Sequence, residues 1–264
     1  MLRALIQQSQ EGQDVEGKYF YAVILCNGRY DLGLTGLQGC NVYTIAYRDI
    51  AAVVSDHPVE RVSLIRKNLS PYHDVTRRFA ENCTTIPAKF GQIAESEEKL
   101  LTVLRCNYSR IRQELERLDR KVEMGLKVTW EVNNLSEYFL KTDAALRTMR
   151  DRIFAAQSHP TTLELIELGL FVSQRMKTRK EAVSERIVSA LRDAVVEEKL
   201  DDPSEEKTVM NGWFLVSKEH QLDFVERADK ATSFLGEEYV IKVNGPWVPF
   251  NFVEHIVLDL QTDN

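Results

Sequence analysis

The sequence holds one group of residues with catalytic potential. His73 is followed by Asp74, and Cys83 lies at the end of the same predicted helix. An imidazole that is oriented by a carboxylate can activate a nucleophile such as a thiol. Adjacent helical positions point in different directions, however, so Asp74 need not reach His73. Two interpretations follow: a ligand-binding or enzymatic domain that uses His73 and Cys83, or ordinary surface residues.

Residues that could hold a metal ion or a phosphate lack the required spacing. The 5 histidines form no HxH or HxxxH pair, and the 4 cysteines form no CxxC pair. The glycines of segment 33–39 are followed neither by Lys-Ser/Thr nor by a predicted helix, which favours a flexible loop over a phosphate site. We therefore expect no metal, no cofactor, no catalytic residue and no enzymatic activity.

Composition and charge narrow the classes of partner. The 264 residues are 44% hydrophobic and 28% charged, and the net charge is −6. This balance is typical of a globular protein and gives no long-range attraction for nucleic acid or an anionic membrane. Scattered cysteines favour reduced thiols, and hence a cytoplasmic location. Residues 1–17 lack the apolar region of a signal peptide or membrane span, and we expect them to be a flexible tail.

Residues 18–132 are predicted to form a first domain rich in strands. Ser70 and Pro71 are typical of a helix start, as the N-cap and first helical residue, and this helix should end near Asn82. Leucines and other apolar residues recur every three or four positions over 96–119, which predicts one amphipathic helix. Runs of β-branched and aromatic residues predict the strands, at 18–26, 41–46, 50–55, 84–90 and 122–130. This order of elements predicts a modified ferredoxin-like α/β sandwich.

Residues 133–264 are predicted to form a second, helical α+β domain. Capping boxes at Asn134 and Thr161 open helices with heptad-like spacing, which predicts coiled-coil-like packing. Leu163, Ile166 and Leu170 should form an early seam in the stretch 162–200, and a later one follows the polar sequence QRMKTRKE. That polar sequence predicts either an exposed middle of a helix or a local break. The domain ends in a β-α-β unit, with elements at 207–217, 218–235 and 238–243.

Two aromatic segments are candidates for contact with a partner. In segment 86–92, Pro87 removes a backbone donor and Gly91 ends the strand, so the strand should lie at a sheet edge or carry a kink. Segment 245–253 forms an aromatic strap in which two prolines stiffen an extended backbone. Such a strap either seals a domain or offers an adhesive surface. The candidate contact residues are Lys89, Phe90, Trp247, Phe250 and Phe252.

The same segments resemble the gas vesicle protein F/L family. The resemblance is carried in order along nearly the whole chain by YFYAV, RDIAAVVSD, YHDV, IPAKFGQ, VEMGLKVTW, GWFLVSKEHQLDFV and GPWVPFNFV, which begin at residues 19, 48, 72, 86, 122, 212 and 245. Lys89 departs from this pattern, in which an Arg is expected, and this puts in doubt any role that needs a bidentate guanidinium.

The resemblance implies an accessory or minor structural protein of gas vesicle assembly, without catalytic residues. It implies a cytoplasmic, gas-vesicle-associated protein that binds the hydrophobic major shell protein and other accessory proteins. A soluble protein could hold the apolar faces and strand edges of an unassembled shell subunit by edge pairing or by an aromatic patch. Our hypothesis is that the sheet of the first domain near Lys89 and Phe90 contacts the shell protein, and that the long helices contact other accessory proteins.

Overall fold

The chain is an α+β protein made of two compact units. The computed structural model describes residues 17–26, 31–156, 160–202 and 205–253. The first unit comprises Met1–Lys121 together with Trp247–Asn264, and the second is Val122–Pro246. The tail predicted over residues 1–17 lies outside the described residues except for Gly17.

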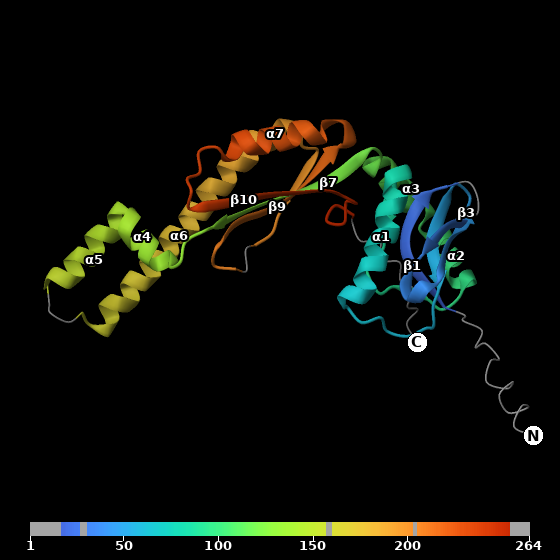
Figure 1. Ribbon diagram of the computed structural model, residues 1–264, viewed down its shortest axis with the longest axis horizontal. Coiled ribbons are helices and arrows are strands. Elements are labelled where there is room, and N and C mark those ends of the chain that lie inside the picture. Colours follow the sequence, from blue (N-terminus) through green and yellow to red (C-terminus); the bar gives the residue numbers. More distant parts are fainter. Residues whose placement is uncertain (1–16, 27–30, 157–159, 203–204, 254–264) are drawn as a thin grey trace, which may run out of the picture. The chain divides into compact units, whose positions relative to one another are not determined.

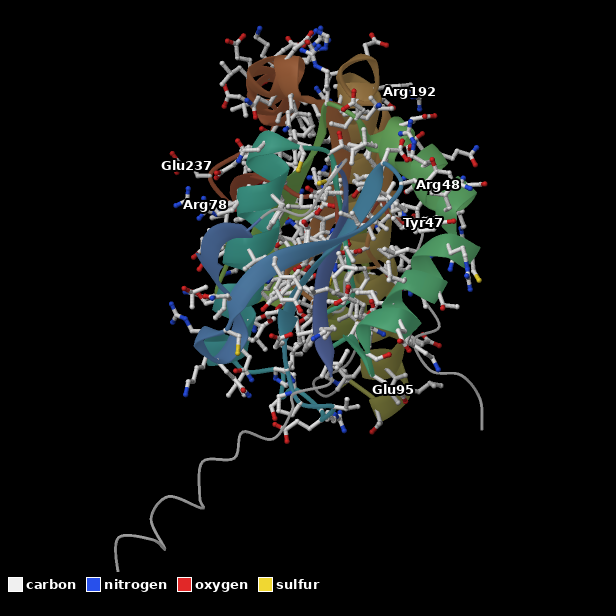
Figure 2. The ribbon with its side chains drawn as sticks, turned by 90° about the vertical axis from the view of Figure 1, so that its right-hand side faces the viewer. Tyr47, Arg48, Arg78, Glu95, Arg192 and Glu237 are labelled. Carbon is white, nitrogen blue, oxygen red and sulfur yellow. The ribbon has the colours of Figure 1, made fainter. Side chains whose placement is uncertain are left out.

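The first unit contains an antiparallel sheet with helices on both faces. The sheet has the order β2-β3-β4-β1-β5, and β6 also pairs with β1. Figures 1 and 2 show the sheet between α1 on one side and the α2–α3 pair on the other. The elements are β1 (Lys18–Leu25), β2 (Asp31–Thr35), η1 (Leu37–Gly39), β3 (Asn41–Tyr47), β4 (Ile50–Asp56), α1 (Arg66–Asn82), β5 (Thr85–Pro87), β6 (Ile93–Ala94), α2 (Glu97–Cys106) and α3 (Tyr108–Leu118).

The second unit packs helices on one face of a four-stranded sheet (Figure 1). Its sheet has the order β10-β7-β9-β8. Helices α6 and α7 pack against β9 and against each other, while α4 and α5 pack on α6. The elements are β7 (Lys121–Trp130), α4 (Leu135–Thr142), α5 (Ala144–Ala156), α6 (Thr162–Leu191), η2 (Arg192–Ala194), β8 (Glu197–Leu200), β9 (Thr208–Ser217), η3 (Lys218–His220), α7 (Gln221–Thr232) and β10 (Tyr239–Trp247).

Each unit is organised around a central strand that separates two parallel strands. In the first unit, β1 runs antiparallel to both β4 and β5, which α1 connects. In the second unit, the backbone N–H of Trp130 bonds to Lys207 O and that of Glu131 to Glu238 O. The end of β7 therefore lies beside the starts of β9 and β10, which α7 connects. Both units thus contain a β-α-β element whose two strands have a third strand between them.

The division of the chain differs from the predicted boundary at residue 132. Strand β7 belongs to the second sheet, because its apolar side chains (Val122, Met124, Leu126, Val128 and Trp130) join the core formed with α6, α7 and β9. The strap was expected to belong to the second domain. Its residues from Trp247 onward belong to the first unit, where Val248, Phe252 and Val253 are buried.

Several helix boundaries also differ from the predicted ones. Helix α1 begins at Arg66, before Pro71, so the proline lies inside the helix. The helix expected over 96–119 is interrupted at Asn107, whose side-chain amide bonds to Val103 O. Segment 33–39, expected to be a flexible loop, contains the end of β2 and the short helix η1. The polar sequence QRMKTRKE lies within α6, which is continuous over 30 residues.

Candidate interaction surfaces

The candidate residue Phe90 packs in an aromatic cluster of the first unit. The Tyr72 ring lies 5.4 Å from the ring of Phe90 and 6.1 Å from that of Phe250, and Tyr19 lies 6.2 Å from Phe90. The Tyr72 hydroxyl donates a hydrogen bond to Ala88 O. Burial raises the pKa of the Tyr72 phenol, so the hydroxyl keeps the proton that it donates. Phe90 is therefore held in place by α1 and β1.

Lys89 lies on a rigid turn beside this cluster. The backbone N–H of Gln92 bonds to Lys89 O at 3.3 Å, and Gly91, at φ +85°, donates its N–H to the Tyr19 hydroxyl at 3.0 Å. The preceding strand β5 pairs with β1 at one end of the sheet, as its proline predicts. All three β5 residues are buried, whereas Lys89 is exposed. This edge is short, and it presents a charged side chain next to a half-buried aromatic ring.

The strap contributes three aromatic residues with different environments. Phe252 is 1% exposed, and its backbone carbonyl accepts a hydrogen bond from the Arg117 guanidinium of α3. The Phe250 ring is half-buried and lies 5.7 Å from that of His73. Trp247 is 50% exposed at the end of β10. Phe252 is therefore part of the core of the first unit, whereas Trp247 at the start of the same segment remains accessible.

The proposed catalytic group does not assemble. The His73 ring packs on Tyr72 and Phe250, and Asp74 forms an ion pair with Arg77 at 3.5 Å. The Cys83 thiol donates to Phe79 O at 3.1 Å. His73 and Cys83 are ten positions apart, which corresponds to ~15 Å along a helix axis. The geometry therefore gives no support to an active site that uses these residues.

A structured hairpin turn was not anticipated as a surface feature. Figure 2 shows Tyr47 and Arg48 at the turn between β3 and β4. Arg48 has φ +55°, and its guanidinium carbon lies 4.8 Å from the centre of the Tyr108 ring of α3. Asp49 accepts the Tyr108 hydroxyl at 2.7 Å, and this bond holds the pKa of the Asp49 carboxyl below its usual value. The sequence signal for this turn is the three-residue segment Tyr47-Arg48-Asp49 between the strands predicted at 41–46 and 50–55.

A groove in the second unit was also missed. It encloses about 340 Å³ between α4 and α6. On its wall, Asp143 accepts two short bonds from Arg175, each at 2.7 Å, and also accepts the backbone N–H groups of Ala145 and Leu146. Asp143 thus caps α5 and ties it to α6. Asp143 and Arg175 are 32 positions apart in the sequence. Local periodicity gives no signal for a contact between residues so far apart.

The described residues contain neither a cluster that could hold a metal ion nor a helix that could span a membrane. No group of three or more His, Cys, Asp or Glu residues in the described part of the chain could hold a metal ion. None of the helices found there is both long enough and apolar enough to span a bilayer. None of the four cysteines forms a disulfide bond.

Comparison with known proteins identifies the family. The family model described as gas vesicle synthesis protein GvpL/GvpF matches residues 17–254. The chain belongs to the GvpL/GvpF family. This confirms the resemblance drawn from the seven sequence segments.

Relatives and solved structures of the GvpL/GvpF family agree with this assignment. Gas vesicle protein F of Dolichospermum flosaquae is 22% identical over 239 residues, covering 89% of this chain and 97% of the relative. Gas vesicle protein F of Haloferax mediterranei is 25% identical over 236 residues, covering 88% and 91%. The crystal structure of GvpF from Anabaena sp. PCC7120 has a TM-score of 0.78 at 20% identity, covering 90% of this chain and 98% of that one. GvpF from Microcystis aeruginosa has a TM-score of 0.74 at 18% identity, covering 89% and 98%.

Proposed function

We propose that this chain is an accessory or minor structural protein of gas vesicle assembly, located in the cytoplasm and associated with gas vesicles. The observation that carries the proposal is the match to the GvpL/GvpF family of gas vesicle synthesis proteins over residues 17–254. In this function the chain works by binding other proteins, namely the hydrophobic major shell protein and further accessory proteins. It performs no chemical reaction.

The surface at Lys89 and Phe90 is our candidate for contact with the shell protein. Lys89 is exposed on a turn that is fixed by Tyr19, and Phe90 offers part of its ring beside it. A rigid, partly exposed aromatic residue next to a charge loses little conformational entropy when a partner binds. Strand β5 is too short and too buried to pair with an incoming strand, so we favour contact through side chains over edge pairing.

The fold of each unit is consistent with separate contacts, by the first unit to the shell protein and by the second to other accessory proteins. We propose that the first unit is a modified ferredoxin-like sandwich, since α1 joins two parallel strands with β1 between them. We propose that α4, α5 and α6 form a coiled-coil-like arrangement that contacts other accessory proteins. Their mutual packing and the 30-residue length of α6 support this proposal.

Co-purification of the shell protein with the full-length chain tests the contact at Lys89. Lys89→Glu should reduce the amount of bound shell protein by at least about 5-fold, the factor that corresponds to ~1 kcal/mol. Arg78→Glu makes the same charge change at an exposed position of α1, and it is the matched control that should bind like the wild type. Equal binding by Lys89→Glu and the wild type would rule out this contact.

A further inference from the structure

Helix α6 is apolar on two sides. Leu168, Val172 and Met176 are buried in the core of the second unit. On the same helix Leu163, Ile166 and Leu170 are 66%, 53% and 67% exposed. Each residue turns the helix by about 100°, so the spacing i, i+3 and i+7 places the second set in one row, opposite the buried set. The sequence predicted these three residues as a seam, but the described part of the second unit leaves the seam uncovered.

We propose that the α6 outer stripe, formed by Leu163, Ile166 and Leu170, docks an amphipathic helix of a different protein that carries basic residues beside its apolar positions. The proposal rests on the proposed function, and it specifies how another accessory protein is held. Three exposed apolar residues at helical spacing match the way in which one amphipathic helix packs on another.

One charged residue beside the α6 outer stripe indicates the charge that a partner helix should carry. Glu167 flanks Leu163 and Leu170 and is exposed, and the ion pairs among the described residues do not include it. Glu164 is engaged in the N-terminal capping box with Thr161. A partner helix with Lys or Arg at the flanking position would therefore complement Glu167.

A second copy of this chain fits the stripe poorly. In an antiparallel pair, setting the apolar residues against one another places Glu167 beside its own copy. Shifting the register to bring Glu167 opposite Lys177 instead places Leu163 opposite Glu181. A parallel pair would bring Lys177 opposite Lys177. Each arrangement opposes like charges or separates the apolar residues, so a different chain is the better occupant.

Binding of designed peptides to the full-length chain tests the proposal. The probes are two labelled helical peptides with identical leucine seams, one with Lys and one with Glu at the flanking positions, and the measurement is fluorescence anisotropy. The Lys peptide should bind about 3- to 5-fold more tightly than the Glu peptide. Ile166→Glu should weaken its binding by about 30-fold or more. Leu222→Glu, at a 75% exposed position of α7, is the matched control and should bind like the wild type.

A charge-reversal variant separates docking from a purely structural role. Glu167→Lys should reverse the preference between the two peptides, which a general loss of folding would not do.

Several outcomes would overturn the proposal. Failure of both peptides to bind would do so, as would an equal loss of binding in Ile166→Glu and Leu222→Glu. A dimer in analytical ultracentrifugation that Ile166→Glu dissociates would show that a second copy occupies the stripe. None of these outcomes changes the binding of the shell protein, which is measured separately with Lys89→Glu.

Discussion

Buried hydroxyl groups connect the aromatic core of the first unit to its backbone. The rings of Tyr19 and Tyr21 lie 4.8 Å apart, and Tyr72 stacks 6.2 Å from Tyr21. The Tyr21 hydroxyl accepts the N–H of Leu37 at 2.8 Å and lies 3.0 Å from Ser55 Oγ. Burial raises the pKa of Tyr21, so this phenol stays neutral over the physiological range. Hydrogen bonds of this kind fix the positions of rings that apolar packing alone would leave free to shift.

Gly36 makes the Tyr21 network possible. A Cβ at Gly36 would lie 2.2 Å from the Tyr21 hydroxyl oxygen. Gly36→Ala should therefore displace the hydroxyl, leave buried polar groups unpaired and lower the free energy of unfolding by about 1–3 kcal/mol. Urea unfolding monitored by circular dichroism measures the change. Gly33→Ala is a control without steric contact, since nothing lies within 4 Å of its Cβ, although its φ of +62° adds a small backbone cost. Equal stability of Gly36→Ala and the wild type would contradict this account.

At the scale of single elements, Asp143 determines how α5 joins α6. Partial burial would raise the pKa of the Asp143 carboxyl, but the hydrogen bond from Arg175 and those from the N–H groups of Leu146 and Ala145 outweigh it and hold the pKa below the usual value. A carboxyl whose folded pKa is depressed stabilises the fold above its unfolded pKa of about 4, and this stabilisation is lost as the pH falls through the folded value.

Substitutions at Asp143 separate its two roles. Asp143→Ala removes both the cap and the ion pair and should lower the free energy of unfolding by about 1–3 kcal/mol at pH 7. Asp143→Asn keeps a good capping residue, so it should cost less, and it should reduce the loss of stability below about pH 4, because other carboxyls with lowered pKa values, such as Asp49, remain. Thermal unfolding at pH 7 and pH 3 measures both effects. An unchanged pH dependence in Asp143→Asn would show that this carboxylate is not responsible.

Local sequence signals predicted many elements correctly but not their ends. The capping box at Thr161 and Glu164 is present, and β3 and β4 form where runs of β-branched and aromatic residues predict strands. The start of α1 was predicted too late, because Ser70-Pro71 is typical of a first turn, whereas Ile65 forms the actual N-cap. The break at Asn107 was missed because the apolar spacing continues across it. Periodicity reports which face is apolar, and it does not report a single residue that leaves the helical conformation.

At the scale of the whole molecule, sequence order and spatial grouping disagree. Strand β7 follows the first unit directly along the chain and was assigned to it, yet it is an inner strand of the second sheet, between β10 and β9. The strap lies near the end of the sequence and packs in the first unit. Contacts between segments that are more than a hundred residues apart, such as Arg117 with Phe252, leave no local pattern. The candidate contact residues Phe90 and Phe250 could be named from sequence, but their shared contact with Tyr72 could not.

The returning strap should stabilise the first unit. Phe252 is 1% exposed, so Phe252→Ala should lower the free energy of unfolding by about 3–5 kcal/mol through the lost burial and the cavity left behind. Trp247→Ala removes a larger ring that is 50% exposed and should cost less. Thermal unfolding followed by near-ultraviolet circular dichroism compares the two variants. A greater loss of stability in Trp247→Ala than in Phe252→Ala would mean that the strap does not seal this core.

The central claim is that this chain acts in gas vesicle assembly by binding other proteins through exposed surfaces. It is tested most directly in cells that make gas vesicles and whose own copy of this chain has been deleted, with vesicles counted by electron microscopy. The account predicts that the wild-type chain restores vesicles, and that a chain carrying both Lys89→Glu and Ile166→Glu does not, although it is folded and equally abundant. Full restoration of vesicles by this double variant would contradict the claim.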